Sequence, residues 1–165
     1  MATFGDTTQE STSFTAVQYE MVGRVGSPAN NGIVTSLNGY MCVPTGTVVS
    51  MGLYTTAGAL VVKSSDMTGT GAGTGWQTFP VTNTAVTAGT NYAILLQTNT
   101  ASSATWYRST GHTSGDSLYY DNTSYQWPAS VTFLNSSSWY STYATYTPMI
   151  NSVSSQAIYI PEGLF

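Results

Sequence analysis

The chain has 165 residues, of which only 6% are charged, and its formal net charge is −4. A globular domain ordinarily carries about 25% charged residues. The three cations, Arg24, Lys63 and Arg108, cannot form a basic patch, so we expect no nucleic-acid binding. Hydrophobic residues make up 41%, which excludes a disordered chain, but no apolar run is long enough to cross a bilayer. These values indicate one folded domain without membrane insertion.

Short segments rich in β-branched and aromatic residues alternate along the chain with turn signals such as "SPANNG", "VPTG" and "TAGTN". This spacing favours an all-β sandwich or barrel. No apolar pattern of period 3.6 persists long enough to predict a helix. The expected strands, in chain order, cover residues 14–26, 32–43, 47–55, 59–64, 76–81, 91–98, 103–108, 117–120 and 139–147.

The strand expected at 91–98 is apolar on both faces. Elsewhere, as in "VVSMGLYT" at 48–55, Val49, Met51 and Leu53 alternate with Ser50, Gly52 and Tyr54. This is the period of a half-buried strand. We therefore expect strand 91–98 to be central, or to have its outer face covered by a loop or a neighbouring subunit. In the strand before it, Trp76 and Phe79 are expected to act as anchors. We interpret the pair of strands as the part of the sandwich least expected to touch a partner.

A glycine run, "GTGAGTG" at 69–75, superficially suggests a nucleotide-binding loop. A Walker-type loop places Lys and then Ser or Thr after its last glycine, but Trp76 follows here. The dinucleotide fingerprint needs a glycine where Thr74 stands, and a helix rather than a strand after it. We therefore interpret the run as a flexible connector between strands.

The two ends of the chain differ from its middle. Residues 1–10 lack the basic and apolar regions of a signal peptide, so we interpret them as a short leader. Residues 11–147 form the expected sandwich domain. Residues 148–165 form a C-terminal extension whose apolar side chains should pack on the sandwich or on a neighbouring subunit. The apolar residues of this assembly tail are Ile158, Tyr159, Ile160, Leu164 and Phe165.

Catalysis needs several ionisable groups in one place, and the sequence has few. His112 is the only histidine, and Asp116 is the nearest acid in its loop. No serine lies in a nucleophile elbow, and none of the seven acids lies in a recognisable glycosidase or calcium-binding motif. The single cysteine, Cys42, excludes an internal disulfide and a multi-cysteine metal site. We expect no catalytic residue, no metal site and no cofactor.

The second half of the chain is rich in aromatic residues beside amides and carboxylates. Such rings suit sugars, because the apolar face of a pyranose stacks on the ring while polar neighbours bond its hydroxyls. They also suit protein interfaces and structural lids, and the sequence leaves all three alternatives open. Strand alternation should send one of Trp106 and Tyr107 inward and the other outward. The candidate glycan or partner contacts are Trp106, Tyr120, Asp121, Asn122, Tyr125 and Trp127.

Several segments, taken in order, carry a family resemblance. They are "GTVVSMGLYT" at 46–55, "GWQTFPV" at 75–81, "TAGTNYAILLQT" at 87–98, the Tyr-rich stretch from "TWYR" to "WP", and "YSTYATYTP" at 140–148. Over about residues 11–147 this order resembles a jelly-roll sandwich domain of phage structural proteins and bacterial surface proteins. The opening "MATFGDTT" is similar to the leader of stand-alone phage versions. The resemblance implies a jelly-roll β-sandwich of about eight or nine antiparallel strands with essentially no helix.

The resemblance also implies a non-catalytic, adhesive or carbohydrate-binding-like module. We expect a structural protein of a tailed phage, either a capsid decoration or a fibre-type component, on the surface of a virion assembled in the host cytoplasm. It would be a homo-oligomer, with a trimer favoured, that binds other virion proteins such as the major capsid protein through its termini and has cell-surface glycans as further candidate partners. The main alternative is a carbohydrate-binding module that uses Tyr125, Trp127 and Trp106. A remote alternative is a polysaccharide-degrading enzyme that uses His112 or Asp116.

Overall fold

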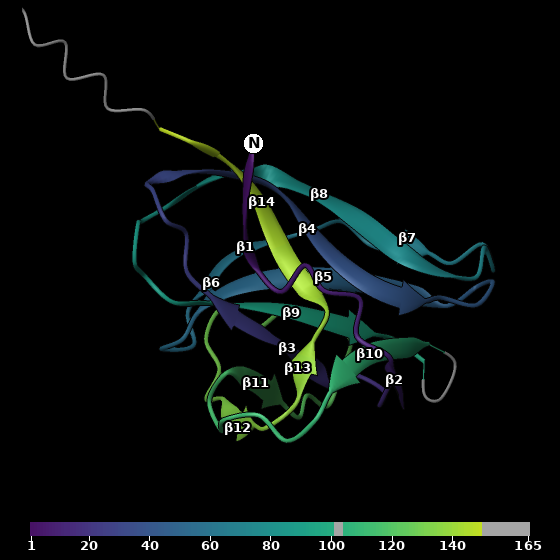
Figure 1. Ribbon diagram of the computed structural model, residues 1–165. Coiled ribbons are helices and arrows are strands. Elements are labelled where there is room, and N and C mark those ends of the chain that lie inside the picture. Colours follow the sequence, from purple (N-terminus) through teal and green to yellow (C-terminus); the bar gives the residue numbers. More distant parts are fainter. Residues whose placement is uncertain (101–103, 150–165) are drawn as a thin grey trace, which may run out of the picture.

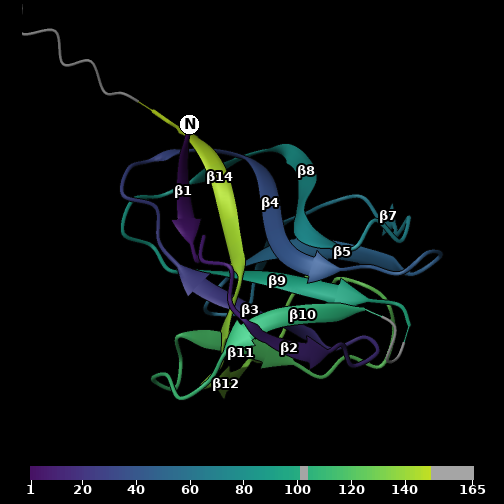
Figure 2. The same cartoon turned by 45° about the vertical axis from the view of Figure 1, so that its right-hand side comes forward.

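The computed structural model describes residues 1–100 and 104–149 as two antiparallel β-sheets packed face to face (Figure 1 and Figure 2). These residues form strands and loops only, and none of them lies in a helix that could span a membrane. The all-β class and the sandwich are therefore confirmed, whereas the jelly-roll connectivity stays a prediction. The apolar residues expected to form an assembly tail, Ile158, Tyr159, Ile160, Leu164 and Phe165, lie outside the described residues.

Sheet A is built around one long strand with partners along both of its edges. Its strands are β1 (Ala2–Gly5), β2 (Thr12–Thr15), β4 (Gly32–Cys42), β8 (Thr74–Val86), β10 (Thr105–Ser109), β13 (Trp139–Tyr140) and β14 (Thr142–Pro148). β8 pairs along one edge of β4, and β14 and β10 pair along its other edge. β1 pairs with β14, while β2 and β13 pair with β10. β8 is consequently an edge strand.

Sheet B packs against sheet A and has β9 near its middle. Its strands, in the order of their pairing, are β12 (Leu134–Ser136), β11 (Ser117–Tyr120), β3 (Met21–Gly26), β9 (Tyr92–Thr98), β5 (Val48–Thr55) and β6 (Leu60–Lys63), and β7 (Met67–Thr68) also pairs with β5. One isolated bridge, between Ser64 and Val81, connects the two sheets beside β8.

The structure has more strands than the eight or nine expected, because several ladders are only two to four residues long. The expected strand 14–26 is two strands in different sheets, β2 and β3. The chain turns between them at Tyr19, which has a φ of 66° and so interrupts the extended backbone. The expected strand 139–147 is likewise divided into β13 and β14. Such short ladders are set by tertiary pairing, and their local sequence gives no separate signal.

Residues expected to form a leader are partly integrated into the sandwich. Ala2–Gly5 form β1, which pairs with β14 from Tyr146 back to Tyr143. Phe4 is buried, with its ring centroid 5.9 Å from that of Tyr92 and 5.7 Å from that of Tyr146. A four-residue strand with one inward side chain is too short for sequence periodicity to detect.

The main core lies between the sheets and follows the alternation of the strands. Met51, Leu53, Ile94 and Leu96 are fully buried there, and each such side chain stabilises the fold by about 1.5–3 kcal/mol. β9 lies between β3 and β5, and its other face carries a second buried cluster that includes Ala93 and Leu95. Of the alternatives expected for strand 91–98, the central position is confirmed, and its outer face is covered as well.

Candidate functional site

The loop of residues 121–133, between β11 and β12, covers the outer face of sheet B, and we call it the lid. Trp127 packs directly on Gly52 of β5, where an ideal Cβ would lie 2.5 Å from the indole ring. Its indole N–H donates a hydrogen bond to Ser50 Oγ at 2.9 Å, and Tyr125 donates its hydroxyl to the same oxygen at 2.8 Å. Burial raises the pKa of the Tyr125 phenol. These two rings are therefore attached to their own protein by their polar atoms.

The structure does not bring the six predicted contact residues together on one surface. Trp106 is 1% exposed and lies in the main core, so its prediction as a surface contact is wrong. The reason is the alternation of β10, which turns Trp106 inward and leaves Tyr107 half-buried on the outer side. Tyr120 is half-buried and packs against the second cluster beneath the lid, whereas Asp121 is exposed. Asn122 is engaged within the lid, because its Nδ2 donates to the carbonyl of Gln126.

Four aromatic rings form a continuous cluster on the outer face of sheet A. Tyr40, Trp76, Tyr107 and Tyr143 come from four strands, β4, β8, β10 and β14, and all are half-buried. The ring centroid of Tyr40 lies 5.5 Å from that of Trp76 and 5.2 Å from that of Tyr107, and Trp76 lies 4.9 Å from Tyr143. The rings meet at angles of 57° to 67°. We call this surface the aromatic face.

The strand registers explain why the four rings meet. Tyr40 is paired directly with Trp76 across β4 and β8, so both side chains stand on the same side of sheet A. Phe79 is 2% exposed and faces the core, and Trp76, three residues earlier, must therefore face outward. Phe79 therefore packs in the core, whereas Trp76 packs against Tyr40 and Tyr143 on the outer face. The odd spacing between the two residues is the sequence signal that predicts opposite faces.

Neutral polar groups surround the aromatic face. Asn38 accepts a hydrogen bond from Thr78 Oγ1 at 2.8 Å and donates one to Thr145 Oγ1 at 3.1 Å. Within the described residues, the hydroxyls of Tyr40 and Tyr143 and the indole N–H of Trp76 have no protein partner. The face thus combines apolar rings with hydroxyl and amide groups and has donors left for a ligand.

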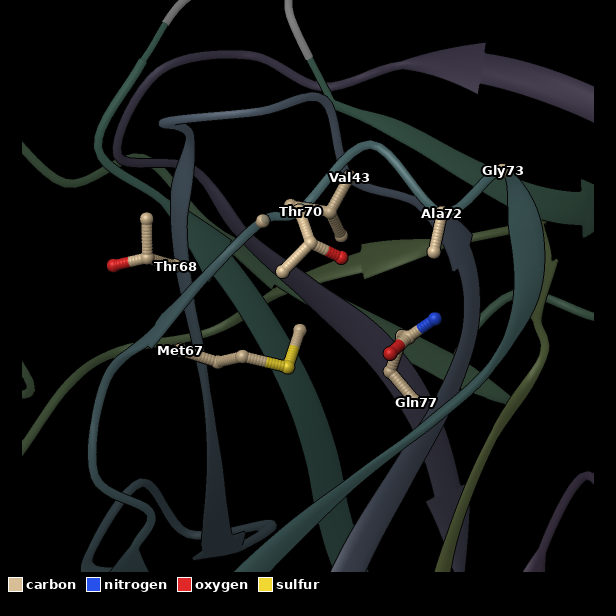
Figure 3. A pocket seen from close by; sticks show the side chains of 8 residues that line it. Val43, Met67, Thr68, Thr70, Ala72, Gly73 and Gln77 are labelled. Atoms are coloured by element: carbon tan, nitrogen blue, oxygen red, sulfur yellow. The ribbon is translucent and has the colours of Figure 1, made fainter.

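Two small cavities open along the free edge of β8. The glycine-loop cavity, of about 230 Å³, is shown in Figure 3 and is lined by Val43, Met67, Thr68, Gly69, Thr70, Ala72, Gly73 and Gln77. The second cavity, of about 290 Å³, is lined by Ser65, Asp66, Met67, Thr78, Phe79 and Pro80. Met67 borders both, so the two cavities are neighbours. Residues 69–73 of the glycine run connect β7 to β8, as expected, but Thr74 and Gly75 are the first two residues of β8.

A group of charged and aromatic side chains lies around β13 and the loop after β10. The Trp139 ring is stacked on His112 at 3.7 Å, and the Arg24 guanidinium lies 3.8 Å from the Trp139 ring centroid. Both groups are too close to share one face of the indole, so they must occupy opposite faces. Ser109 Oγ lies 2.7 Å from His112 Nε2, but Asp116 accepts the hydrogen bond of the Trp139 indole N–H at 3.1 Å. The acid closest in sequence to His112 thus orients Trp139.

Glu20 and Arg108 lie near one another at the edge of the main core. Burial, assisted by the nearby charge of Asp121, raises the pKa of Glu20 to about 7, although Arg108 opposes this shift. Glu20 Oε2 and Arg108 Nε are both buried without a hydrogen-bond partner within the described residues. The Arg108 guanidinium lies 4.2 Å above the Phe14 ring and donates to Ser138 Oγ at 3.0 Å. Glu20 is therefore a carboxyl group that titrates near neutral pH.

In residues 1–100 and 104–149, no three side chains of His, Cys, Asp or Glu converge so that they could hold a metal ion. Comparisons with protein-family models, with curated proteins and with solved structures found no match.

Proposed function

We propose that this protein is a non-enzymatic binding module whose aromatic face binds uncharged glycans. The observation that carries the proposal is the cluster of Tyr40, Trp76, Tyr107 and Tyr143 on the outer face of sheet A. Rings gathered on a surface and rimmed by polar groups mark an interaction site. A pyranose can stack on such rings while its hydroxyls bond the free phenol and indole groups.

The neighbours of the rings favour a glycan over a protein partner. The core of a protein interface is enriched in Met and Arg beside its aromatic residues and is depleted in Ser. The outward positions next to the rings are instead Ser36, Asn38, Thr74, Thr78 and Thr145. None of them carries a charge, so the surface is suited to a neutral ligand.

We further propose that the module is displayed, as a homo-oligomer, on the surface of a phage particle. The sequence resemblance supports this setting, and so does the position of the first and last described strands. Because Ala2 pairs with Tyr146, the start of β1 and the end of β14 lie together at one end of the sandwich (Figure 1). Attachment through both ends, to a partner such as the major capsid protein, would leave the flank of sheet A accessible. Display in many copies would convert weak glycan contacts into avidity.

A glycan array tests the binding function. We expect the protein to bind one or more uncharged glycans and Trp76→Ala to lose that binding, because the stacking ring is removed. Trp139→Ala is the matched control: Trp139 is another half-buried tryptophan, away from the aromatic face, and its loss should leave binding intact. Thermal melting verifies that both variants are folded. The proposal fails if no uncharged glycan binds, or if binding survives Trp76→Ala.

A further inference from the structure

Adjacent residues of β8 connect the aromatic face to the glycine-loop cavity. Trp76 stands on the outer face of sheet A, and Gln77, one residue later, points to the other side and lines the cavity (Figure 3). Among the described residues, β8 pairs only with β4 over this stretch, so within that part of the chain its other edge has free backbone N–H and C=O groups. The face and the cavity are thus separated by a single strand edge.

Between the two sites, the edge of β8 is formed by Thr74 and Gly75, directly after Gly73. Ideal Cβ atoms at Gly73 and Gly75 would meet nothing within 4 Å, so both positions border open space. Between them Thr74 is exposed, and its hydroxyl lies 3.1 Å from the Tyr107 hydroxyl on the aromatic face. A ligand can therefore cross the edge in contact with backbone, without meeting a side chain larger than threonine.

The cavity, like the aromatic face, combines apolar side chains with uncharged polar groups. Val43 and Met67 provide apolar walls, and Figure 3 shows the side chains of Met67 and Gln77 directed towards the same space. Within the described residues, the Gln77 amide and the Thr70 hydroxyl form no hydrogen bond with the protein. None of the described residues that line the cavity is charged, and its volume of about 230 Å³ is below the range typical of drug-sized ligands. One neutral sugar unit fits these limits.

We propose that the ligand is a linear, uncharged polysaccharide that lies on the aromatic face, crosses β8 at Gly75 and places a further sugar unit in the glycine-loop cavity, where Gln77 bonds its hydroxyls. This inference rests on the proposed glycan-binding function. It adds the class of ligand, which is a polymer longer than the aromatic face alone can hold, and it adds a second subsite.

Calorimetric titration with short and long oligosaccharides tests the inference. The probes are the dimers and hexamers of β-1,4-linked N-acetylglucosamine, glucose and mannose. We expect at least one hexamer to bind about 10-fold more tightly than its dimer, since only the hexamer reaches both sites. Gly75→Val places a side chain in the open space where the ligand would cross β8. Gln77→Met removes the amide of the cavity at similar volume. Each variant should bind the hexamer about 5- to 10-fold more weakly and bind the dimer as the native chain does.

Two further variants separate the possible failures. Trp76→Ala should weaken dimer and hexamer alike, and Ala85→Val, an exposed substitution near the far end of β8, should bind both as the native chain does. If Trp76→Ala abolishes binding while Gly75→Val and Gln77→Met leave the hexamer unaffected, the crossing is wrong and the proposed function stands. If no hexamer binds more tightly than its dimer, the second subsite is wrong, and the glycan array decides separately on the proposed function.

Discussion

The outer faces of the two sheets both carry aromatic rings, but they use them differently. On sheet B, the polar atoms of Trp127 and Tyr125 are bonded to Ser50 on the strand beneath, and the lid closes the surface. On sheet A, the rings of Trp76 and Tyr40 pack against each other at a tilt of 57°, and their N–H and O–H groups have no partner within the described residues. Rings that satisfy their own donors stabilise the fold, whereas rings that leave donors free can bind a ligand.

The largest expected difference between the two faces concerns their tryptophans. Trp127→Ala should lower the free energy of unfolding by about 2–4 kcal/mol, because it leaves a cavity between lid and sheet and removes one of the two hydrogen bonds that Ser50 Oγ accepts from the lid. Trp76→Ala should lower it by only about 1 kcal/mol or less, because its ring packs on the surface. Urea denaturation measures both values. Equal losses would contradict the distinction between a structural lid and a binding face.

Two glycines sharpen the same comparison. Gly52→Ala should destabilise the protein by about 1–3 kcal/mol, because the new methyl group would overlap the Trp127 ring and displace the lid. Gly75→Ala, at the edge of the aromatic face, has open space around it and should change stability by less than about 0.5 kcal/mol. Denaturation midpoints provide the test. A tolerated Gly52→Ala would show that the lid does not pack on β5 as described.

Substitution of Ser50 should have a smaller effect on stability. Its Oγ accepts hydrogen bonds from two side chains of the lid. Ser50→Ala should cost about 1–3 kcal/mol, since the Trp127 N–H and the Tyr125 hydroxyl both lose their bond to its oxygen. Thr74→Val removes one hydroxyl bond on the aromatic face, where water can replace it, and should cost less than about 0.5 kcal/mol. Hydrogen exchange of the Trp127 indole N–H should become faster in Ser50→Ala only. An unchanged exchange rate would contradict the role of Ser50.

Glu20 should make a small, pH-dependent contribution to stability. Burial raises its pKa to about 7, and the charge of Asp121, the first lid residue, assists this shift. The folded state binds this proton more tightly than the unfolded chain, so the contribution of Glu20 to stability is largest at low pH and is lost as the pH rises through about 7. The group is partly exposed, which reduces the effect to about 1 kcal/mol. Glu20→Gln should therefore stabilise the protein more at pH 8 than at pH 5, as thermal melting can measure. A larger gain at pH 5 would contradict the assigned direction.

The sequence was sufficient for features that depend on alternation within one strand. The doubly apolar run "NYAILLQT" predicted a covered central strand, and Trp106-Tyr107 predicted one ring on each side of a sheet. The same rule, applied to the spacing of Trp76 and Phe79, would have placed Trp76 on the surface. Alternation predicts only that two adjacent side chains lie on opposite sides of a sheet, however. It does not predict which ring of Trp106-Tyr107 faces the core.

The aromatic face could not be predicted as a site, because it depends on pairing between distant segments. Tyr40, Trp76, Tyr107 and Tyr143 are spread over about a hundred residues, and only the registers of β4 with β8, β10 and β14 bring them together. The adjacent rings in "YYDNTSYQWP" were more conspicuous in sequence, yet Tyr125 and Trp127 belong to the lid. Local aromatic density therefore indicated a structural cover, whereas the dispersed rings formed the open surface.

The most direct test follows the indole N–H signals of the four tryptophans in a ¹H–¹⁵N NMR titration with the oligosaccharide that binds best. Substitution of each tryptophan in turn assigns the signals. We expect the Trp76 signal to shift progressively with ligand while the Trp127 signal stays in place. A shift of the Trp127 signal with the Trp76 signal unaffected would contradict binding on the aromatic face, because the glycan would then bind at the lid.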